Sequence, residues 1–165
     1  MKLREAVRNL LIFELGDSTN PYDYRVTEIV PKKYKYIKRF EFESDAGHQY
    51  EIKFEAVNDR HGTITVDFRV KGQPIKAVTN EGNPYRVMAT VIAAARKVWK
   101  NKDEIEDAFD NPNIASYPVL GFFFTPIGTD FKKVEQREKL YKAFIRSQFP
   151  NAEINKNNYG IEVIP

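Results

Sequence analysis

The chain has no cysteine, only two histidines, and no apolar run near the roughly 18 residues that a membrane-spanning helix needs. The missing cysteine excludes disulfides, thiolate nucleophiles and cysteine-based zinc sites. His48 and His61 fall in segments with the composition of hairpin turns, and neither belongs to a metal-binding motif. We therefore expect a soluble protein that binds neither a membrane nor a metal.

A large excess of one charge is also missing. The 26 Lys and Arg residues nearly balance 23 Asp and Glu, which leaves a formal charge of +3. A typical nucleic-acid-binding domain has a larger excess of positive charge, clustered on one face. What the chain does have is 12 Phe, 9 Tyr and enough length to bury roughly 70% of its unfolded surface. We interpret residues 17–165 as a single globular domain.

Residues 1–16 are predicted to form an amphipathic helix. Apolar residues recur there at helical spacing, and turn-forming residues follow at 16–21. The apolar stretch of this helix is too short for a secretory signal peptide. We expect the helix to pack on the domain.

Three segments between residues 34 and 70 alternate apolar and polar residues with a period of two, which predicts half-buried strands. Turn-forming residues separate them at 44–47 and 58–62. An antiparallel meander with one apolar and one charged face follows, so its glutamates are surface charges rather than a catalytic acid pair. The apolar positions are Tyr34, Tyr36, Phe40, Phe42, Tyr50, Ile52, Phe54, Ala56, Ile64, Val66, Phe68 and Val70.

Two helices are predicted to cover the apolar face. The first runs from Arg86 to Lys100, with Pro84 or Tyr85 near its first position, and the second from Gln136 to Phe149. Residues 100–113 are polar and indicate a surface excursion between core elements.

Three further strands complete the predicted fold. Val78 and Thr79 are expected to end one, and residues 160–164 to close the sheet. Residues 117–124 form a near-continuous apolar run, which is typical of a central strand covered on both faces. The predicted class is α+β: a mixed, mostly antiparallel, twisted sheet with two helices packed on one face.

Residues 32–39 interleave five cations with aromatic residues, as single-strand nucleic-acid binders do. Tyr34 and Tyr36 share the parity of Phe40 and Phe42, so the same segment also fits an edge strand with solvated lysines. Nucleic acid stays open as a partner. The residues that would bind it are Lys32, Lys33, Lys35, Lys38 and Arg39.

The turn before the first long helix is a second candidate site. Unpaired backbone N–H groups at a helix start can hold an anion such as a phosphate. The turn lacks the repeated glycines of diphosphate-binding loops, so an ordinary helix start is the alternative reading. The residues concerned are Gly82, Asn83, Tyr85 and Arg86.

The segment from Val78 to Val163 resembles a group of small accessory proteins encoded by tailed bacteriophages. The matching pieces are residues 85–91 after the glycine turn, the aromatic run at 121–125, and Arg137 to Tyr141. Many such proteins begin with a short helix that a prohead protease removes after Leu or Ile, any residue, and Glu. Ile12-Phe13-Glu14 fits this rule, which implies processing after Glu14.

The phage resemblance implies an accessory protein, and the sequence carries no catalytic signature, so we expect a non-enzymatic protein that needs no cofactor and binds a host or virion protein. It also implies a location in the virion interior or the bacterial host cytoplasm. This is the function that we favour from the sequence.

The order of strands and helices is also similar to the cofactor-binding half of GNAT-type acetyltransferases. In that family a pyrophosphate loop precedes a helix, and the last helix often carries Leu-Tyr, as Leu140 and Tyr141 do here. Residues 80–84 depart from the family's loop pattern. The resemblance implies acetyl-CoA as cofactor at Gly82 to Arg86 and Tyr141 as general acid. Acyltransferase and nucleic-acid-binding protein are thus the two alternatives to an interaction protein.

Overall fold

The protein forms an α+β fold, as predicted, and its described residues build one mixed sheet of seven strands. The computed structural model describes residues 20–73, 84–125 and 131–165, so the expectations for residues 1–16 and for Val78 and Thr79 lie outside it. The elements in chain order are β1 (Tyr24–Pro31), β2 (Lys35–Glu43), β3 (Gln49–Val57), β4 (Thr63–Val70), α2 (Pro84–Lys100), α3 (Asp103–Phe109), β5 (Gly121–Phe124), α4 (Phe131–Gln148), β6 (Glu153–Lys156) and β7 (Ile161–Ile164).

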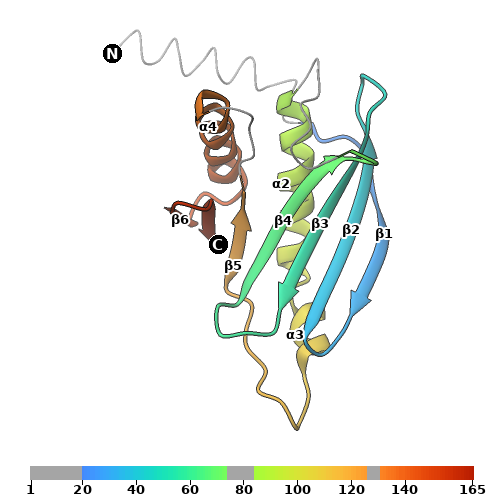
Figure 1. Cartoon of the computed structure of the whole chain (residues 1–165), viewed down its shortest axis with the longest axis vertical. Helices are drawn as coiled ribbons and strands as arrows, with labels where there is room; N and C mark the ends of the chain where they lie inside the picture. Colours follow the sequence, from blue (N-terminus) through green and yellow to red (C-terminus); the bar gives the residue numbers. More distant parts are fainter. Residues whose placement is uncertain (1–19, 74–83, 126–130) are drawn as a thin grey trace.

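The predicted meander is confirmed in β2, β3 and β4, which pair antiparallel with β1 added at the edge. Even-numbered side chains such as Phe40, Ile52 and Ile64 are fully buried on the inner face. The register pairs Phe40 with Ile52 and Ile52 with Phe68, so apolar side chains meet across all three strands. The twisted meander is the largest part of the sheet (Figure 1).

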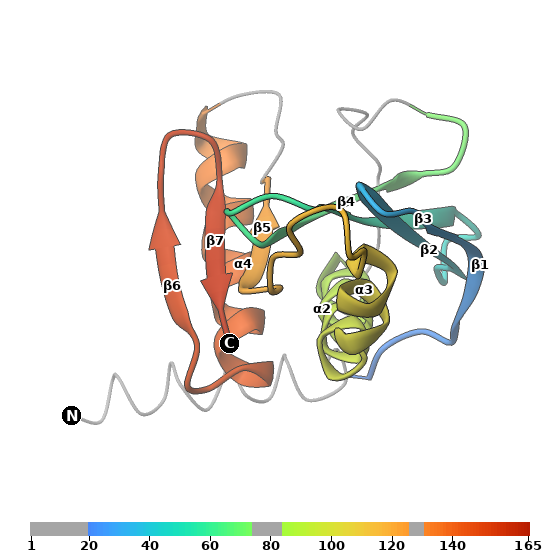
Figure 2. The same cartoon turned by 90° about the horizontal axis from the view of Figure 1, so that it is seen from below.

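The sheet continues through β5, β7 and β6. β5 pairs parallel with β4 and antiparallel with β7, which confirms its predicted place inside the sheet. Its apolar run is shorter than predicted, because Tyr117 and Leu120 precede the strand and are exposed. The sheet turns sharply here, so the β6–β7 hairpin lies at the end opposite β1 (Figure 2).

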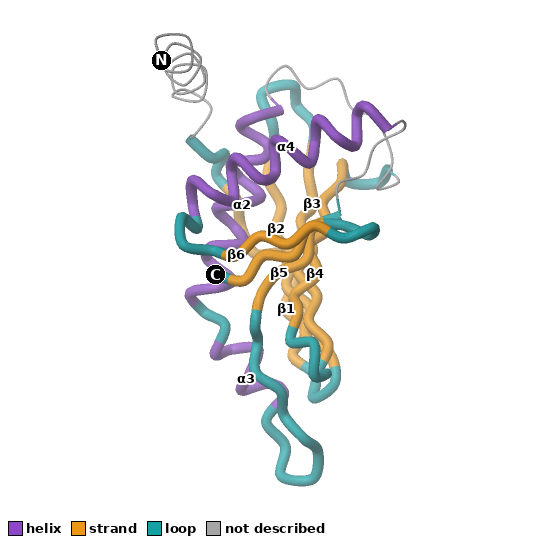
Figure 3. The backbone as a smooth tube through the Cα atoms, turned by 90° about the vertical axis from the view of Figure 1, so that its left-hand side faces the viewer, coloured by secondary structure: helices purple, strands orange, loops and turns teal. Residues whose placement is uncertain are grey.

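The helices α2 and α4 lie side by side and pack against each other (Figure 3). α2 covers the inner face of the meander, and α4 lies over β5 and β7 (Figures 1 and 2). α2 starts at Pro84, which suits proline because the first N–H of a helix has no intrahelical partner. No helix in the described ranges has the length and apolarity needed to cross a membrane.

Phe122 on β5 joins the two helices to the sheet. Its ring centroid lies 5.7 Å from Trp99 on α2, 6.1 Å from Phe149 after α4 and 6.5 Å from Phe54 on β3. The side chain is 0% exposed. Its ring is therefore the point at which the elements of the core meet.

The expectation of a surface excursion over residues 100–113 was wrong, because this segment contains the helix α3. Ile105 and Phe109, four residues apart, both point into the core and are almost fully buried. Asp103, Asp107 and Asp110 are exposed on the solvent side of the segment, and the two apolar side chains anchor its helix.

Three smaller expectations also need correction. β1 and β6 were missed. α4 begins at Phe131, five residues earlier than expected. Tyr34 lies in the β1–β2 turn with 64% of its surface exposed, whereas Tyr36, with the same parity, is buried. Parity predicts burial only inside a strand, and β2 starts after Tyr34.

Candidate functional site

Three loops meet at the end of the sheet where β2 starts and β3 ends: the β1–β2 turn, the β3–β4 turn and the segment that leads into β5 (Figure 1). Asn58 connects all three. Its backbone N–H donates to the Tyr34 carbonyl at 2.9 Å, and its side-chain amide donates to the carbonyls of Lys33 at 3.3 Å and Ala115 at 3.0 Å. Its side-chain oxygen accepts the N–H of Tyr117 at 3.0 Å. These bonds hold segments from distant parts of the sequence in one arrangement.

Gly62 completes the junction. It has φ +60°, a conformation that favours glycine, and its carbonyl accepts the N–H of Leu120 at 2.7 Å. A Cβ atom at this position would lie 2.4 Å from the carbonyl oxygen of Pro118. Only glycine allows the segment before β5 to run this close to the β3–β4 turn.

Large apolar side chains are exposed at this end of the sheet. Tyr34 is 64% exposed, Leu120 49%, Val57 46% and Tyr117 38%. Exposed cations accompany them from the same loops. Gathered apolar exposure of this kind marks interaction sites more often than isolated exposed residues do. We define the tip surface as Lys32, Lys33, Tyr34, Val57, Arg60, Tyr117 and Leu120.

The structure distributes the five predicted nucleic-acid-binding residues over three surfaces. Lys32 and Lys33 belong to the tip surface. Lys35 and Arg39 lie on the outer face, where Lys35 pairs with Glu55 at 3.2 Å. Lys38 lies on the inner face, 6% exposed. The five cations therefore do not form one continuous basic strip.

Lys38 belongs to a partly buried polar cluster with α3. Its ammonium lies 3.2 Å from a carboxylate oxygen of Glu104, and the Tyr36 hydroxyl donates to the same oxygen at 3.2 Å. Burial, together with the charge of Glu104 and this hydrogen bond, raises the pKa of Tyr36 to about 12. The cluster fixes α3 to β2, which is a structural role.

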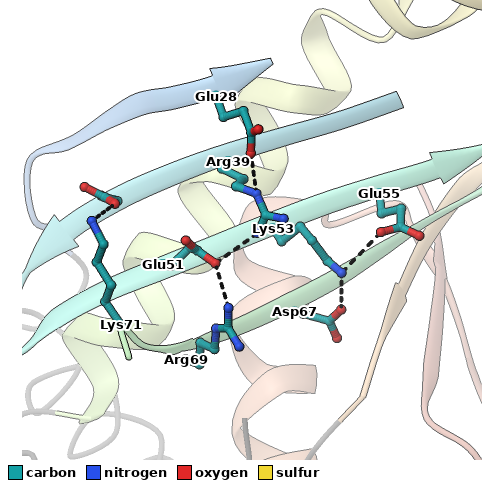
Figure 4. A network of polar contacts seen from close by, with 9 residues as sticks. Glu28, Arg39, Glu51, Lys53, Glu55, Asp67, Arg69 and Lys71 are labelled. Atoms are coloured by element: carbon teal, nitrogen blue, oxygen red, sulfur yellow. Dashed lines mark hydrogen bonds and ion pairs between the residues drawn. The ribbon is translucent and has the colours of Figure 1, made fainter. Parts of the chain in front are cut away.

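The outer face of the meander carries a network of ion pairs (Figure 4). Arg39 contacts Glu28 at 2.6 Å and Glu51 at 2.9 Å, and Arg69 contacts the same oxygen of Glu51 at 3.4 Å. A shallow depression in this face is lined by Arg39, Glu51, Lys53, Asp67 and Arg69. Each cation drawn in the network meets a carboxylate, so the face presents little uncompensated charge.

Arg86, a predicted anion-binding residue, is engaged inside the protein. Its guanidinium lies 4.1 Å from the ring centroid of Tyr22, its Nε donates to the Asn20 carbonyl at 3.0 Å, and it pairs with Asp45 at 3.5 Å. Thr90 accepts the N–H of Tyr22 at 2.9 Å from the next turn of α2. These contacts fix the start of the described chain to α2. Tyr85 is 41% exposed.

The other predicted site residues fall in the core or outside the described ranges. Tyr141 is 4% exposed and lies 6.2 Å from the ring centroid of Phe68 and 5.7 Å from that of Phe124, so it packs the core in this conformation. Gly82, Asn83 and Glu14 are not among the described residues. Within the described part of the chain, no group of three His, Cys, Asp or Glu residues could hold a metal.

The fold and surfaces define an α+β protein with an ordered end that exposes aromatic and basic side chains. Comparisons of this chain with protein-family models, with curated proteins and with solved structures gave no match.

Sequence reasoning missed most of the tip surface. Tyr34 was placed with the core, and Tyr117 and Leu120 were placed in a buried strand. The available signal was the turn chemistry around Asn58 and Gly62, which predicted a turn but could not show what the turn contacts.

Proposed function

We propose that the chain is a non-enzymatic interaction protein, of the accessory kind that tailed bacteriophages encode, and that its tip surface binds a host or virion protein. The observation that supports this is the exposure of Tyr34, Tyr117, Leu120 and Val57 on loops held together by Asn58. Tyrosine is enriched among the residues that dominate binding energy at protein interfaces.

The loops of the tip surface are suited to binding because hydrogen bonds already order them. Ordering a loop on binding costs free energy that a preorganised surface avoids. Lys32, Lys33 and Arg60 add exposed positive charge beside the apolar residues. An acidic patch on the partner would complement them and speed the encounter.

Site-specific photo-crosslinking in producing cells tests this proposal. A photoreactive amino acid replaces Tyr34 or Tyr117 at the tip, and replaces Tyr159 as a control. Tyr159 is 80% exposed and lies between β6 and β7, at the other end of the sheet. We expect a discrete protein adduct from positions 34 and 117 that position 159 does not give. The same pattern at all three positions, or no adduct at the tip, contradicts the proposal.

Nucleic acid is a second candidate partner, favoured by the exposed ring of Tyr34 next to Lys32 and Lys33. This reading predicts salt-sensitive binding of a single-stranded oligonucleotide that weakens severalfold in Tyr34→Ala and in Lys32→Gln/Lys33→Gln. Tyr159→Ala is the control. Nuclease treatment of the crosslinked sample separates the two readings, because it removes a nucleic-acid adduct and leaves a protein adduct intact.

Packaging in the virion is part of the proposal and has its own test. If Ile12-Phe13-Glu14 is cut as in capsid-targeting peptides, mass spectrometry of purified virions should find a mature chain that starts at Leu15. A virion-borne chain that retains Met1 contradicts the processing step.

A further inference from the structure

The two edges of the sheet differ in length and exposure. β1 has eight residues, most of them exposed, and pairs with β2 alone among the described strands. Val26 is 40% and Ile29 48% exposed, and the Arg25 side chain is 81% exposed. β6, at the opposite edge, has only four residues. A long edge strand presents unpaired backbone N–H and C=O groups that another strand can bind.

A bulge in the middle of β1, between Val26 and Glu28, changes which side chains of the strand share a face. Consecutive strand residues point to opposite faces, so residues three apart normally lie on different faces. The register with β2 shifts between Val26 and Glu28, which puts both Arg25 and Glu28 on the outer face, opposite Glu41 and Arg39. The same shift puts Tyr24 and Ile29 together on the inner face, opposite Phe42 and Lys38.

We propose that β1 pairs antiparallel with β1 of a second copy of this chain, around a twofold axis between Val26 and Thr27. In this register Arg25 of each copy lies opposite Glu28 of the other on the outer face, and Tyr24 lies opposite Ile29 on the inner face. Both copies contribute the same patch, as a twofold interface requires. The dimer would form one continuous sheet and would cover Val26 and Ile29. The inference is independent of the proposed function at the tip.

The outer ion-pair network supports this register. The Glu28 carboxylate already accepts a hydrogen bond from Arg39 at 2.6 Å and still has 48% of its side-chain surface exposed. Arg25 makes only a long contact of 3.8 Å with Glu41. Pairing of the two copies would add Arg25 to Glu28 and continue the network across the interface. Opposite charges directly across an antiparallel pair are favourable, and like charges are unfavourable.

The competing explanation is that the bulge and the charges protect the edge of a monomer, because both features discourage strand addition. Native mass spectrometry and sedimentation equilibrium over concentrations up to about 1 mM decide between the two. We expect a dimer whose dissociation constant rises at least about tenfold in Arg25→Glu and in Glu28→Arg. Lys139→Glu is a matched control, because it makes the same charge change as Arg25→Glu at a side chain 77% exposed on α4.

Mixing the two variants is the strongest form of the test. Each Arg25→Glu chain carries an acidic residue at both position 25 and position 28, and each Glu28→Arg chain carries a basic residue at both. Opposite charges therefore meet at both contacts of the mixed pair, and an equimolar mixture should form a heterodimer with affinity near that of the wild type. A wild type that is monomeric throughout, a dimer that neither variant weakens, or a mixture that stays monomeric would overturn the proposal.

A cysteine variant tests the register directly, because the chain has no cysteine of its own. The two copies of Thr27 would be diagonal neighbours across the axis, within roughly the 4.4–6.8 Å between Cα atoms that a disulfide spans. Thr27→Cys should give a covalent dimer under mild oxidation, and Asn155→Cys on β6 should not. Equal crosslinking at both edges, or none at Thr27→Cys, contradicts the pairing.

Discussion

The two faces of the meander come from the same strands and differ in almost every property. The inner face packs aromatic rings together: Phe42 and Tyr50 are stacked with centroids 5.0 Å apart, and Phe40 and Phe54 meet edge to face at 5.6 Å. The outer face consists of partly exposed charges in pairs, such as Lys53 with Asp67 at 3.6 Å. Burial of apolar area stabilises far more than exposed ion pairs do, so the inner face should carry the stability of the fold.

The comparison also explains how the chain has 30% charged residues and a modest net charge. The outer face places acids and bases directly opposite each other, which cancels their fields at a distance. Exposed apolar and basic side chains are concentrated at the tip, and exposed apolar side chains also at the β1 edge. Binding sites are therefore expected at the ends and edge of the sheet rather than on its outer face.

The largest effect is expected for Phe122→Ala on β5, whose ring packs against Phe54 of the inner face. Removal of a fully buried ring should lower the free energy of unfolding by about 3–5 kcal/mol. Urea denaturation measures the loss. Phe123→Ala is the matched control, because Phe123 follows on the same strand with its ring only partly buried. Equal losses in the free energy of unfolding for the two variants would contradict the expected difference between the two faces of the sheet.

Alkaline pH tests the inner polar cluster. The pKa of Tyr36 is raised to about 12 from its ordinary value of 10.0, so the folded state holds this proton more tightly than the unfolded state. The associated stability is present below pH 10 and is lost as the pH rises toward 12, by up to about 2 kcal/mol.

Tyr36→Phe should remove this part of the alkaline decline, as measured by urea denaturation at a series of pH values. Tyr159→Phe, at an exposed phenol, should leave the decline unchanged. Identical pH profiles for wild type and Tyr36→Phe would show that folding does not raise the pKa of Tyr36.

β2, β3 and β4 were predictable because their two faces differ chemically at each step. A shift of one residue would exchange Phe54 with Glu55, so the pattern admits only one register. β1 was missed because both its faces are exposed and the bulge interrupts its alternation. A strand with almost no buried side chains has no alternation of apolar and polar residues from which it could be predicted.

α3 and the tip surface were missed for a different reason. The sequence of α3 is mainly acidic, and its two anchors, Ile105 and Phe109, are too few to reveal a helical period. The tip depends on Asn58 binding Ala115 and Tyr117, which lie 57 and 59 residues further along the chain. No local pattern encodes such contacts, and the exposure of Tyr34 and Leu120 follows from them.

On the outer face, Arg39→Met should lower the free energy of unfolding by only about 0.5–1 kcal/mol, although Arg39 contacts two carboxylates. Most of this loss should disappear at 1 M salt, because salt screens exposed charges. Denaturation at low and high salt makes the comparison. A loss as large as that of Phe122→Ala, or one that salt does not reduce, would mean that the outer face stabilises the fold as much as the buried core does.

The smallest effect is expected for Glu55→Gln. Burial alone would raise the pKa of Glu55, but hydrogen bonds and charges from Lys53 and Lys35 outweigh burial and lower it. A lowered pKa gives stability that is present above pH 4.5 and is lost as the pH falls through the lowered value. The ion pairs of Glu55 with Lys35 and Lys53 are partly solvated. Glu55→Gln should therefore reduce the loss of stability at acid pH by only a few tenths of a kcal/mol. Glu43→Gln, an exposed change of the same kind, is the control, and an equal effect from both would show that the outer network adds nothing beyond its net charge.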